Sequence, residues 1–370
     1  MRPQKLFSSL HGPASLLGPG AFRLFLALVV FVDHASRLAL GPAAVKIFFC
    51  LSGFWIYRMW TERYVRAVSP LFTYLASRGW RLIPTFALIA LFTVAFQHFL
   101  LGRSWVDLKG SAGWPQFVAS HLLIFGYGGL PVQPLMPAWS LDVEMQFYLV
   151  APVLIALAAR IGTPAFLAMA AAVSIGCALW LAPHVSPTFA VFFALGIVAA
   201  RQDWRPSSRL ATAAGIVAVG VVIGLVLSPW RGTILGGIHR GPLFRYTEIV
   251  TTVVALAAFP YAIFTTRQRG GSRDGVFADF SYIVYLLHWT AIGWLGTVAG
   301  LPTFARLGCF VLALTATFAA AWVIWRLYDK PLNRARARWV AARLNRSPQA
   351  TQPERKFPRQ CPAATSPPSP

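Results

Sequence analysis

The chain has 370 residues, of which 57% are hydrophobic and only 12% charged, and its mean hydropathy is +0.60. A soluble globular domain has about 25% charged residues, so this composition excludes an ordinary soluble enzyme and indicates an all-α, polytopic transmembrane helical bundle. The net charge of +22 lies in short basic clusters between apolar segments, a pattern typical of membrane topology signals rather than of nucleic-acid binding. The four cysteines form no C-x-x-C pair and indicate neither a metal site nor a disulfide framework.

Apolar runs recur along the chain to about residue 327 and predict about ten membrane spans. Their approximate limits are 22–40, 43–60, 82–101, 143–160, 164–182, 187–200, 210–228, 247–265, 277–299 and 304–327. The apolar run 116–127 is too short to cross a bilayer, and we expect it to be a re-entrant or interfacial segment.

The basic residues predict the orientation of these spans. With the N-terminus in the cytoplasm, 25 of the 33 Lys and Arg residues fall on the cytoplasmic side, as the positive-inside rule requires. Both termini are therefore expected in the cytoplasm. We divide the chain into a cytoplasmic N-terminal segment (1–21), a transmembrane domain (22–335) and a disordered, basic, Pro-rich cytoplasmic tail (336–370).

The first span contains two ionisable residues, Arg23 and His34, that are eleven residues apart. In an α-helix this spacing corresponds to about three turns plus 20° and a rise of about 16 Å. Both side chains therefore lie on one stripe, with Arg23 near one membrane face and His34 at about mid-depth. Ionisable residues inside a bilayer are costly, and they mark candidate functional sites. Asp33 lies about 100° around the helix from His34, which makes it a poor direct partner.

Polar patches also interrupt the second and third spans. Cys50–Phe54 contains Ser52 and Gly53, which are small enough to allow close helix packing. Arg78 and Arg81 are three residues apart at the expected cytoplasmic mouth of the third span. They are either a positive-inside pair or a clamp for phosphate groups, to which the guanidinium fork is suited.

The fourth span begins with a polar stretch, Pro137–Leu149, that carries Asp142 and Glu144. Asp142 suits the dipole at a helix N-terminus. Glu144 shares a face with Tyr148 and lies nearer the apolar run, so it is the stronger functional candidate. In the ninth span His288 is again expected at about mid-depth, either as a catalytic residue or as a buried histidine that only hydrogen-bonds a neighbour.

In combination these patches resemble the membrane acyltransferase-3 family of bacterial integral-membrane O-acyltransferases of carbohydrates. That family has an Arg-x10-His pair in its first helix, matched by Arg23 and His34. Its other elements are matched in family order: F-F-x-L-S-G-F by Phe48–Phe54, an R-x-x-R-I-x-P-like element by Arg78–Pro84, W-S-L-x-V-E-x-Q-F-Y by Trp139–Tyr148, and S-Y-x-x-Y-L-x-H by Ser281–His288. The resemblance covers residues 22 to about 335. The sequence departs from the family pattern at Gly20-Ala21-Phe22-Arg23, Met145, Thr290 and the short connection around Gly41-Pro42.

The resemblance implies an enzyme that moves an acyl group, usually acetyl, from cytoplasmic acyl-CoA to a hydroxyl of a cell-surface or secreted carbohydrate. The acceptor would be an exopolysaccharide or a lipopolysaccharide, or a lipid-linked saccharide from which it is assembled. The resemblance implies acyl-CoA, usually acetyl-CoA in this family, as the donor substrate, with no bound cofactor and no metal. The location would be the bacterial cytoplasmic (inner) membrane.

The resemblance also implies roles for individual residues. His34 is expected to act as the general base, within a catalytic group that also contains Arg23, Glu144 and His288. The donor phosphates are expected at Arg78 and Arg81. The side chains expected to contact substrate are Trp139, Ser140, Tyr148, Tyr282 and Tyr285.

Two other classes of function fit the same polar residues. Intramembrane Arg, His and Glu also suit a transporter or flippase of lipid-linked sugars, although the hydropathy shows no inverted repeat. A scaffold for polysaccharide assembly is the third class. Turnover of acyl-CoA by the purified protein separates the enzyme from both alternatives.

Overall fold

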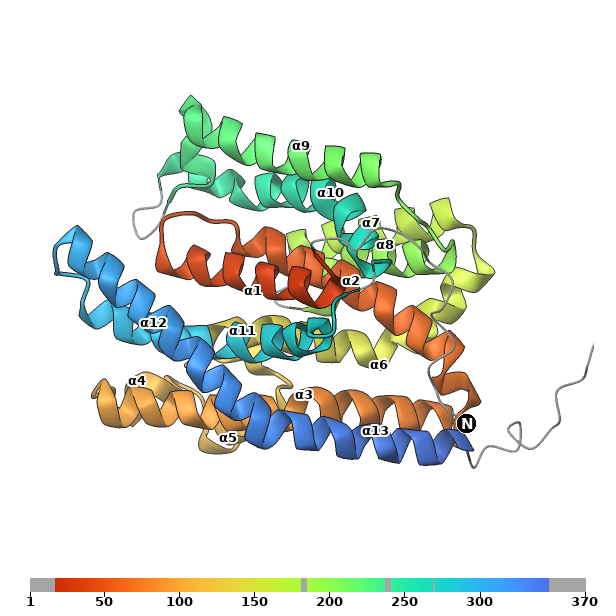
Figure 1. Ribbon diagram of the computed structural model, residues 1–370, viewed down its shortest axis with the longest axis horizontal. Helices are drawn as coiled ribbons and strands as arrows, with labels where there is room; N and C mark the ends of the chain where they lie inside the picture. Colours follow the sequence, from red (N-terminus) through yellow and green to blue (C-terminus); the bar gives the residue numbers. More distant parts are fainter. Residues whose placement is uncertain (1–16, 181–184, 237–240, 269, 346–370) are drawn as a thin grey trace, which may run out of the picture.

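The computed structural model describes residues 17–180, 185–236, 241–268 and 270–345, and within these ranges it is a bundle of helices without strands. The predicted all-α fold is therefore confirmed. The α-helices are α1 (Pro19–Ala35), α2 (Gly41–Glu62), α3 (Pro70–Ala95), α4 (Trp105–Lys109), α5 (Trp114–Leu123), α6 (Trp139–Arg160), α7 (Thr163–Trp180), α8 (Ala190–Arg201), α9 (Ser208–Leu227), α10 (Thr247–Thr266), α11 (Asp274–Thr297), α12 (Thr303–Ile324) and α13 (Lys330–Asn345). Figure 1 shows the long helices running roughly side by side, with α9 and α10 along one edge and α3 and α13 along the other.

Each predicted span coincides with a helix, but the number ten is not established. In the described ranges, seven helical segments are long and apolar enough to cross a membrane. They are α3, α6, α7, α9, α10, α11 and the continuous path of α12 and α13. Of the other three helices, α1 has 17 residues and α8 has 12, and the apolar run of α2 contains Lys46 and Arg58. The short apolar run 116–127 contributes to α5, which has only ten residues and packs against α3.

The first span is shorter than predicted, because α1 ends at Ala35. The following residues are extended: the Ala39 amide donates to the Ile234 carbonyl at 2.7 Å, and this contact prevents the helix from continuing to residue 40. His34 consequently lies in the last turn of α1, and its mid-depth position in the bilayer stays a prediction.

The third span is longer than predicted, because α3 begins at Pro70 rather than at residue 82. Its first turns are polar in sequence, yet Thr73, Ser77 and Arg78 are buried against other helices. A run of apolar residues identifies the part of a helix that faces lipid. It therefore misses helical turns whose polar side chains are buried against other helices. Arg78 lies inside α3 and not at its mouth.

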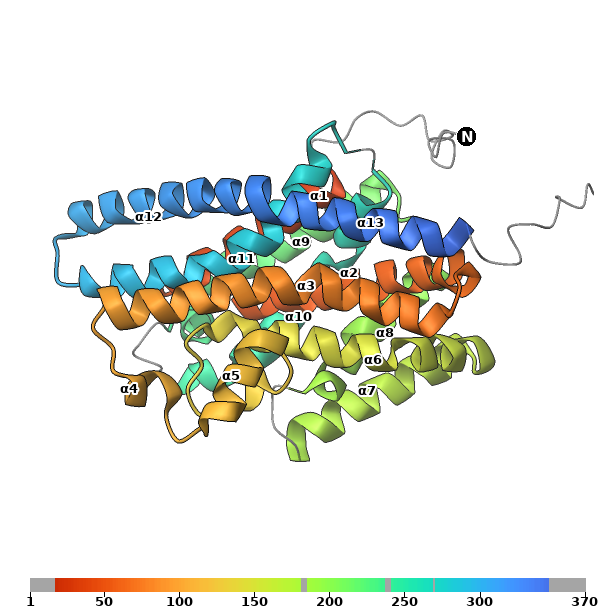
Figure 2. The same ribbon diagram turned by 90° about the horizontal axis from the view of Figure 1, so that it is seen from below.

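The last span continues well beyond its predicted end. After α12 the chain forms a π-helical turn (Trp325–Asp329) and then α13, without leaving the helical path. Figure 2 shows α12 and α13 as one long element, with α13 beside α3. Residues 336–345, which we assigned to a disordered tail, are thus helical because they pack on α3; the rest of that tail, 346–370, lies outside the described residues, as does most of the N-terminal segment.

The pairing of α1 with α11 holds the middle of the bundle together. The two helices run parallel and in register, because Gly20 contacts Asp274 and His34 contacts His288, and in both pairs the residue numbers differ by 254. The Asp274 carboxylate accepts hydrogen bonds from the amides of Gly20 at 2.9 Å and Ala21 at 3.0 Å. These amides at the N-terminus of α1 have no partner within their own helix, and a carboxylate there also complements the helix dipole.

We predict that this pairing tolerates no side chain at Gly20. A Cβ atom there would lie 1.9 Å from the Asp274 carbonyl oxygen, so Gly20→Ala should lower the thermal unfolding temperature in detergent, with an overpacking cost of about 1–3 kcal/mol. Gly275→Ala is the matched control, because a Cβ atom at Gly275 meets nothing within 4 Å. Equal unfolding temperatures for the two variants would contradict the close approach of α1 and α11.

Candidate active site

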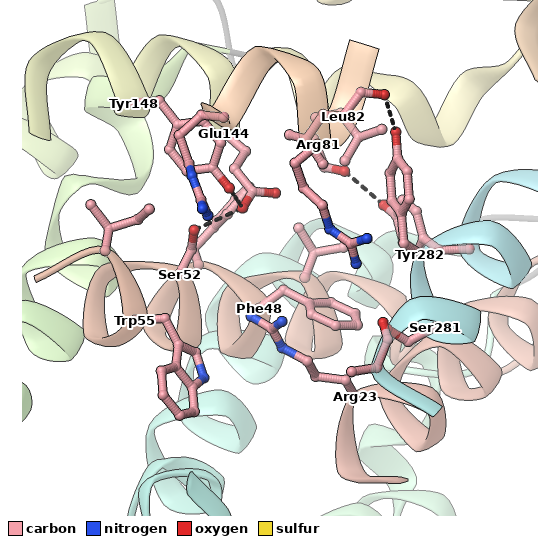
Figure 3. A pocket seen from close by; sticks show the side chains of 18 of the residues that line it. Arg23, Phe48, Ser52, Trp55, Arg81, Leu82, Glu144, Tyr148, Ser281 and Tyr282 are labelled. Atoms are coloured by element: carbon pink, nitrogen blue, oxygen red, sulfur yellow. Dashed lines mark hydrogen bonds between the residues drawn. The ribbon is translucent and has the colours of Figure 1, made fainter. Parts of the chain in front are cut away.

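Most of the predicted site residues line one cavity of about 300 Å³. It lies between α1, α2, α3, α6, α11 and α13, and we call it the first cavity. Figure 3 shows Arg23 and Arg81 extending toward its centre from opposite walls. The polar residues that line it are Arg23, Ser52, Arg78, Arg81, Ser140, Glu144, Tyr148, Ser281, Tyr282, Tyr285 and Arg336.

Three of the four arginines in the first cavity have guanidinium groups that are incompletely paired. The Nε atoms of Arg23, Arg78 and Arg336 are buried and have no hydrogen-bond partner. Arg78 donates one hydrogen bond, from Nη2 to the Tyr64 hydroxyl at 2.9 Å. Burying a cation without a partner is costly, and the only carboxylate among the lining residues is Glu144. The cavity is therefore suited to a ligand that carries several negative charges.

Tyr64, the partner of Arg78, lies in the short 3₁₀ turn Tyr64–Arg66 that follows α2. Its hydroxyl donates to Ser77 Oγ at 2.8 Å. Burial by itself raises the pKa of the Tyr64 phenol, but the Arg78 guanidinium and the hydrogen bonds to Ser77 and Arg78 outweigh burial, and the pKa lies below its ordinary value.

Arg81 differs from the other three because it is already neutralised. Its guanidinium pairs with Asp279 at 3.0 Å and with Asp329 at 3.5 Å. Asp329 is fully buried in the π-helical turn and also accepts hydrogen bonds from Thr85 at 2.9 Å and Asn333 at 2.7 Å. Arg81 thus ties α3 to α11 and to the start of α13, and it adds less free positive charge to the cavity than its position in the sequence suggests.

Glu144 lies on the opposite wall of the first cavity from Arg23 (Figure 3). Its Oε1 accepts hydrogen bonds from Ser52 Oγ at 2.7 Å and from the Tyr148 hydroxyl. Ser52, which we interpreted as a packing residue, is therefore also a site residue. Asp142 instead accepts from the amides of Gly126 and Gly128, so it anchors the preceding loop.

The remaining predicted contact residues divide between the first cavity and the protein interior. The Tyr285 hydroxyl is 2.8 Å from Ser140 Oγ, and the Tyr282 hydroxyl donates to the Leu82 carbonyl at 2.8 Å. All three side chains line the cavity. Trp139 does not line it and packs on Phe189 instead.

The two histidines lie together, beyond the first cavity. His34 Nδ1 is 3.0 Å from His288 Nε2, and His288 is completely buried whereas the His34 side chain is 18% exposed. Asp33 Oδ2 is 3.9 Å from His34 Nε2, too far for a hydrogen bond, as the helical geometry predicted. The Tyr285 ring, 6.0 Å from the His288 ring, lies between the histidine pair and the first cavity.

His34 also lines a second cavity of about 510 Å³ at the other end of α1. This second cavity lies between the end of α1, the end of α11 and the start of α12, and apart from Ser36, Thr303 and Arg306 its walls are apolar. Arg23 and His34 thus share one stripe of α1 but open to different cavities. A single imidazole pair between two cavities can serve two substrates that enter from opposite ends.

Sequence reasoning missed Arg336 and Arg306. Arg336 lies among exposed arginines, so no local pattern distinguishes it from them, whereas Arg306 is an isolated basic residue just after a loop and carries no motif.

A sequence model of a family described as "Acyltransferase domain" matches residues 11–326. The chain is 25% identical to the acyltransferase MdmB of Streptomyces mycarofaciens over 90% of this chain and 93% of that protein. It is 24% identical to nodulation protein 10 of Rhizobium leguminosarum bv. viciae over 87% of this chain and 95% of that protein. Similarity to the O-acetyltransferase OatA of Staphylococcus aureus (27% identity) covers 41% of this chain and 26% of OatA. No solved structure matches the chain.

We predict that the Asp329 carboxylate is the main stabilising partner in the Arg81 group. Asp329→Asn keeps the shape but leaves a buried cation with half of its charge partners, so it should cost roughly 2–4 kcal/mol. Glu62→Gln is the control: it breaks a largely exposed ion pair between Glu62 and Arg58, one helical turn apart on α2. It should lower the free energy of unfolding by less than about 0.5 kcal/mol. Thermal unfolding in detergent measures both variants. Equal losses of stability would show that the buried ion pairs of Arg81 do not stabilise the fold more than an exposed pair does.

Proposed function

Because the chain belongs to the acyltransferase-3 family and is an O-acyltransferase, we propose that it moves an acetyl group from cytoplasmic acyl-CoA to a hydroxyl of a cell-surface or secreted carbohydrate. The acceptor is proposed to be the sugar of an exopolysaccharide or lipopolysaccharide, or of its lipid-linked precursor. The enzyme would lie in the bacterial inner membrane with both termini in the cytoplasm. The observation that carries this proposal is the set of incompletely paired arginines in the first cavity.

The first cavity suits the donor because acyl-CoA carries a diphosphate and a further phosphate at the end remote from its thioester. Arg23 and Arg78 offer buried N–H groups with no acceptor in the protein, and guanidinium forks bind phosphate through paired, charge-assisted hydrogen bonds. The positive-inside rule also favours a cytoplasmic position for this end of the bundle, and acyl-CoA is found in the cytoplasm. In this proposal Arg81, paired with two carboxylates, shapes the donor site more than it neutralises the donor.

The proposed reaction centre is His34 Nε2, because Nδ1 is engaged with His288. For Nε2 to accept a proton, His34 must carry its own proton on Nδ1 and donate it to His288 Nε2, so His288 selects the tautomer. His34 Nε2 takes the proton of the acceptor hydroxyl while the hydroxyl oxygen attacks the thioester carbonyl. The carbon–sulfur bond then breaks, and the imidazolium returns the proton to the CoA thiolate.

The second cavity is the proposed entrance for the acceptor. It reaches His34 from the side opposite the first cavity, and its polar groups, Ser36 and Arg306 among them, lie on a largely apolar wall. The exposed Phe304 and Leu307 beside it belong to a face of α12 that suits contact with lipid. An acceptor attached to a membrane lipid could therefore present its sugar to His34 without leaving the bilayer surface.

The first test of this function concerns the two histidines. His34→Gln keeps a hydrogen-bonding side chain but cannot take a proton, so transfer of labelled acetyl from acetyl-CoA to the carbohydrate of host membranes should fall by about 10²–10⁴-fold. His288→Gln retains an acceptor for His34 and should lose less. His98→Gln is the control, because His98 lies in the π-helical turn Phe96–Leu100, hydrogen-bonds the Arg103 carbonyl and lines neither cavity. Near-normal transfer by His34→Gln together with an inactive His288→Gln would assign the base to His288.

The second test concerns the donor. Arg78→Gln should weaken acetyl-CoA binding to the purified protein by roughly tenfold, because a charge-assisted phosphate contact is lost. Arg78→Lys should recover only part of the affinity, because an ammonium lacks the fork. Arg66→Gln, an exposed residue near the same end of the bundle, should bind like the unmodified protein. Full acetyl-CoA affinity in a folded Arg78→Gln variant would reject the donor site.

A further inference from the structure

Arg336 reaches the first cavity from a helix that lies beyond the end of the family match. That match ends at residue 326, whereas α13 begins at Lys330 and packs along α3. Arg336 lines the cavity, its Nε is buried without a partner, and its Nη1 makes only long contacts with Ser77, of 3.4 Å to the hydroxyl and 3.5 Å to the carbonyl. The exposed arginines on either side of it in the sequence, Arg334 and Arg338, do not line the cavity.

The surroundings of Arg336 are strongly cationic. Arg336 is largely buried, and the positive charges of Arg78, Arg81 and Arg63 on neighbouring elements disfavour its own charge, which the Tyr64 phenol favours. Arg81 is already satisfied by Asp279 and Asp329. Among the described residues no carboxylate forms an ion pair with Arg336, so an anionic ligand would stabilise its buried charge.

Arg336 lies at the end of the first cavity away from the histidine pair, at the level of Ser77 and Arg78 on α3. On α3, Thr93 is bonded to Thr290, two residues after His288, whereas Arg336 contacts Ser77. Sixteen residues of helix separate these two levels, or about 24 Å at 1.5 Å per residue. A donor whose thioester reaches His34 would leave its opposite end, the phosphorylated ribose, beside Arg336.

We propose that Arg336 binds the 3′-phosphate of the CoA donor, while Arg78 beside it and Arg23, on the helix that carries His34, hold its diphosphate. This inference rests on the proposed function, and it makes α13 the element that selects CoA over donors that lack the 3′-phosphate. A phosphate monoester at neutral pH carries close to two negative charges, which suits the most cationic part of the cavity.

The test compares binding of acetyl-CoA and acetyl-dephospho-CoA, which lacks only the 3′-phosphate, to the purified full chain in detergent. The unmodified protein should prefer acetyl-CoA by roughly tenfold or more. Arg336→Gln should lose most of this preference by weakening acetyl-CoA binding alone, and Arg336→Lys should retain part of it. The ratio of the two affinities is measured on one preparation, so partial loss of folded protein cancels. Arg338→Gln, exposed one half-turn away, should keep the full preference.

Each other outcome overturns the proposal in a distinguishable way. If the unmodified protein binds both donors equally, or if Arg336→Gln keeps its preference, the 3′-phosphate lies elsewhere and the donor site itself stands. If Arg336→Gln weakens both donors to the same extent, Arg336 contacts a part of CoA that they share. If acetyl-CoA does not bind the unmodified protein at all, the proposed donor fails, and this inference fails with it.

Discussion

The parallel, in-register contact between α1 and α11 is the constraint on which the rest of the site depends. Two parallel neighbours place like ends of their helix dipoles together, which is unfavourable. The Asp274 carboxylate offsets this by accepting the free amides of Gly20 and Ala21, and the absence of a side chain at Gly20 lets the backbones touch. Four turns further on, the same register places His34 within hydrogen-bond distance of His288. The geometry of the histidine pair is thus set at the other end of the two helices.

The second constraint is that Arg81 on α3 is largely buried and needs carboxylate partners. Arg81 is buried with two carboxylates, and this group joins three segments that are distant in sequence. Breaking such a group is costly because a charge is left without partners, so it acts as a fixed wall of the first cavity. Arg23, Arg78 and Arg336 have no such partners. The protein therefore separates arginines that hold the fold from arginines that are free to bind a ligand, although both kinds look alike in sequence.

The sequence predicted the elements of this site better than their ends. Helical periodicity correctly placed Arg23 and His34 on one stripe of α1, because that depends only on residues within one helix. It could not reveal that the helix stops at Ala35, because the contact that stops it comes from Ile234, about two hundred residues away. Arg336 was assigned to a tail for the same reason: its helix is stabilised by burial of Val340 and by the Arg343 side chain, which donates to Thr73 on α3. Composition alone contains none of these tertiary contacts.

The presence of two cavities suggests how an acyl group would move from one side of the protein to the other. Under the proposed function, donor and acceptor approach the same imidazole from opposite ends of the bundle, so neither substrate has to pass the other. Tyr285 lines the first cavity and has its ring 6.0 Å from that of His288; its hydroxyl is 2.8 Å from Ser140 Oγ, and its ring packs on Phe48 with centroids 6.0 Å apart. Rotation of one hydrogen-bonded tyrosine is a far smaller change than the rigid-body motion that carries a whole solute across a membrane. If such a rotation opens the path from the first cavity to His288, an enzyme that passes only an acyl group needs no rigid-body motion of its helices.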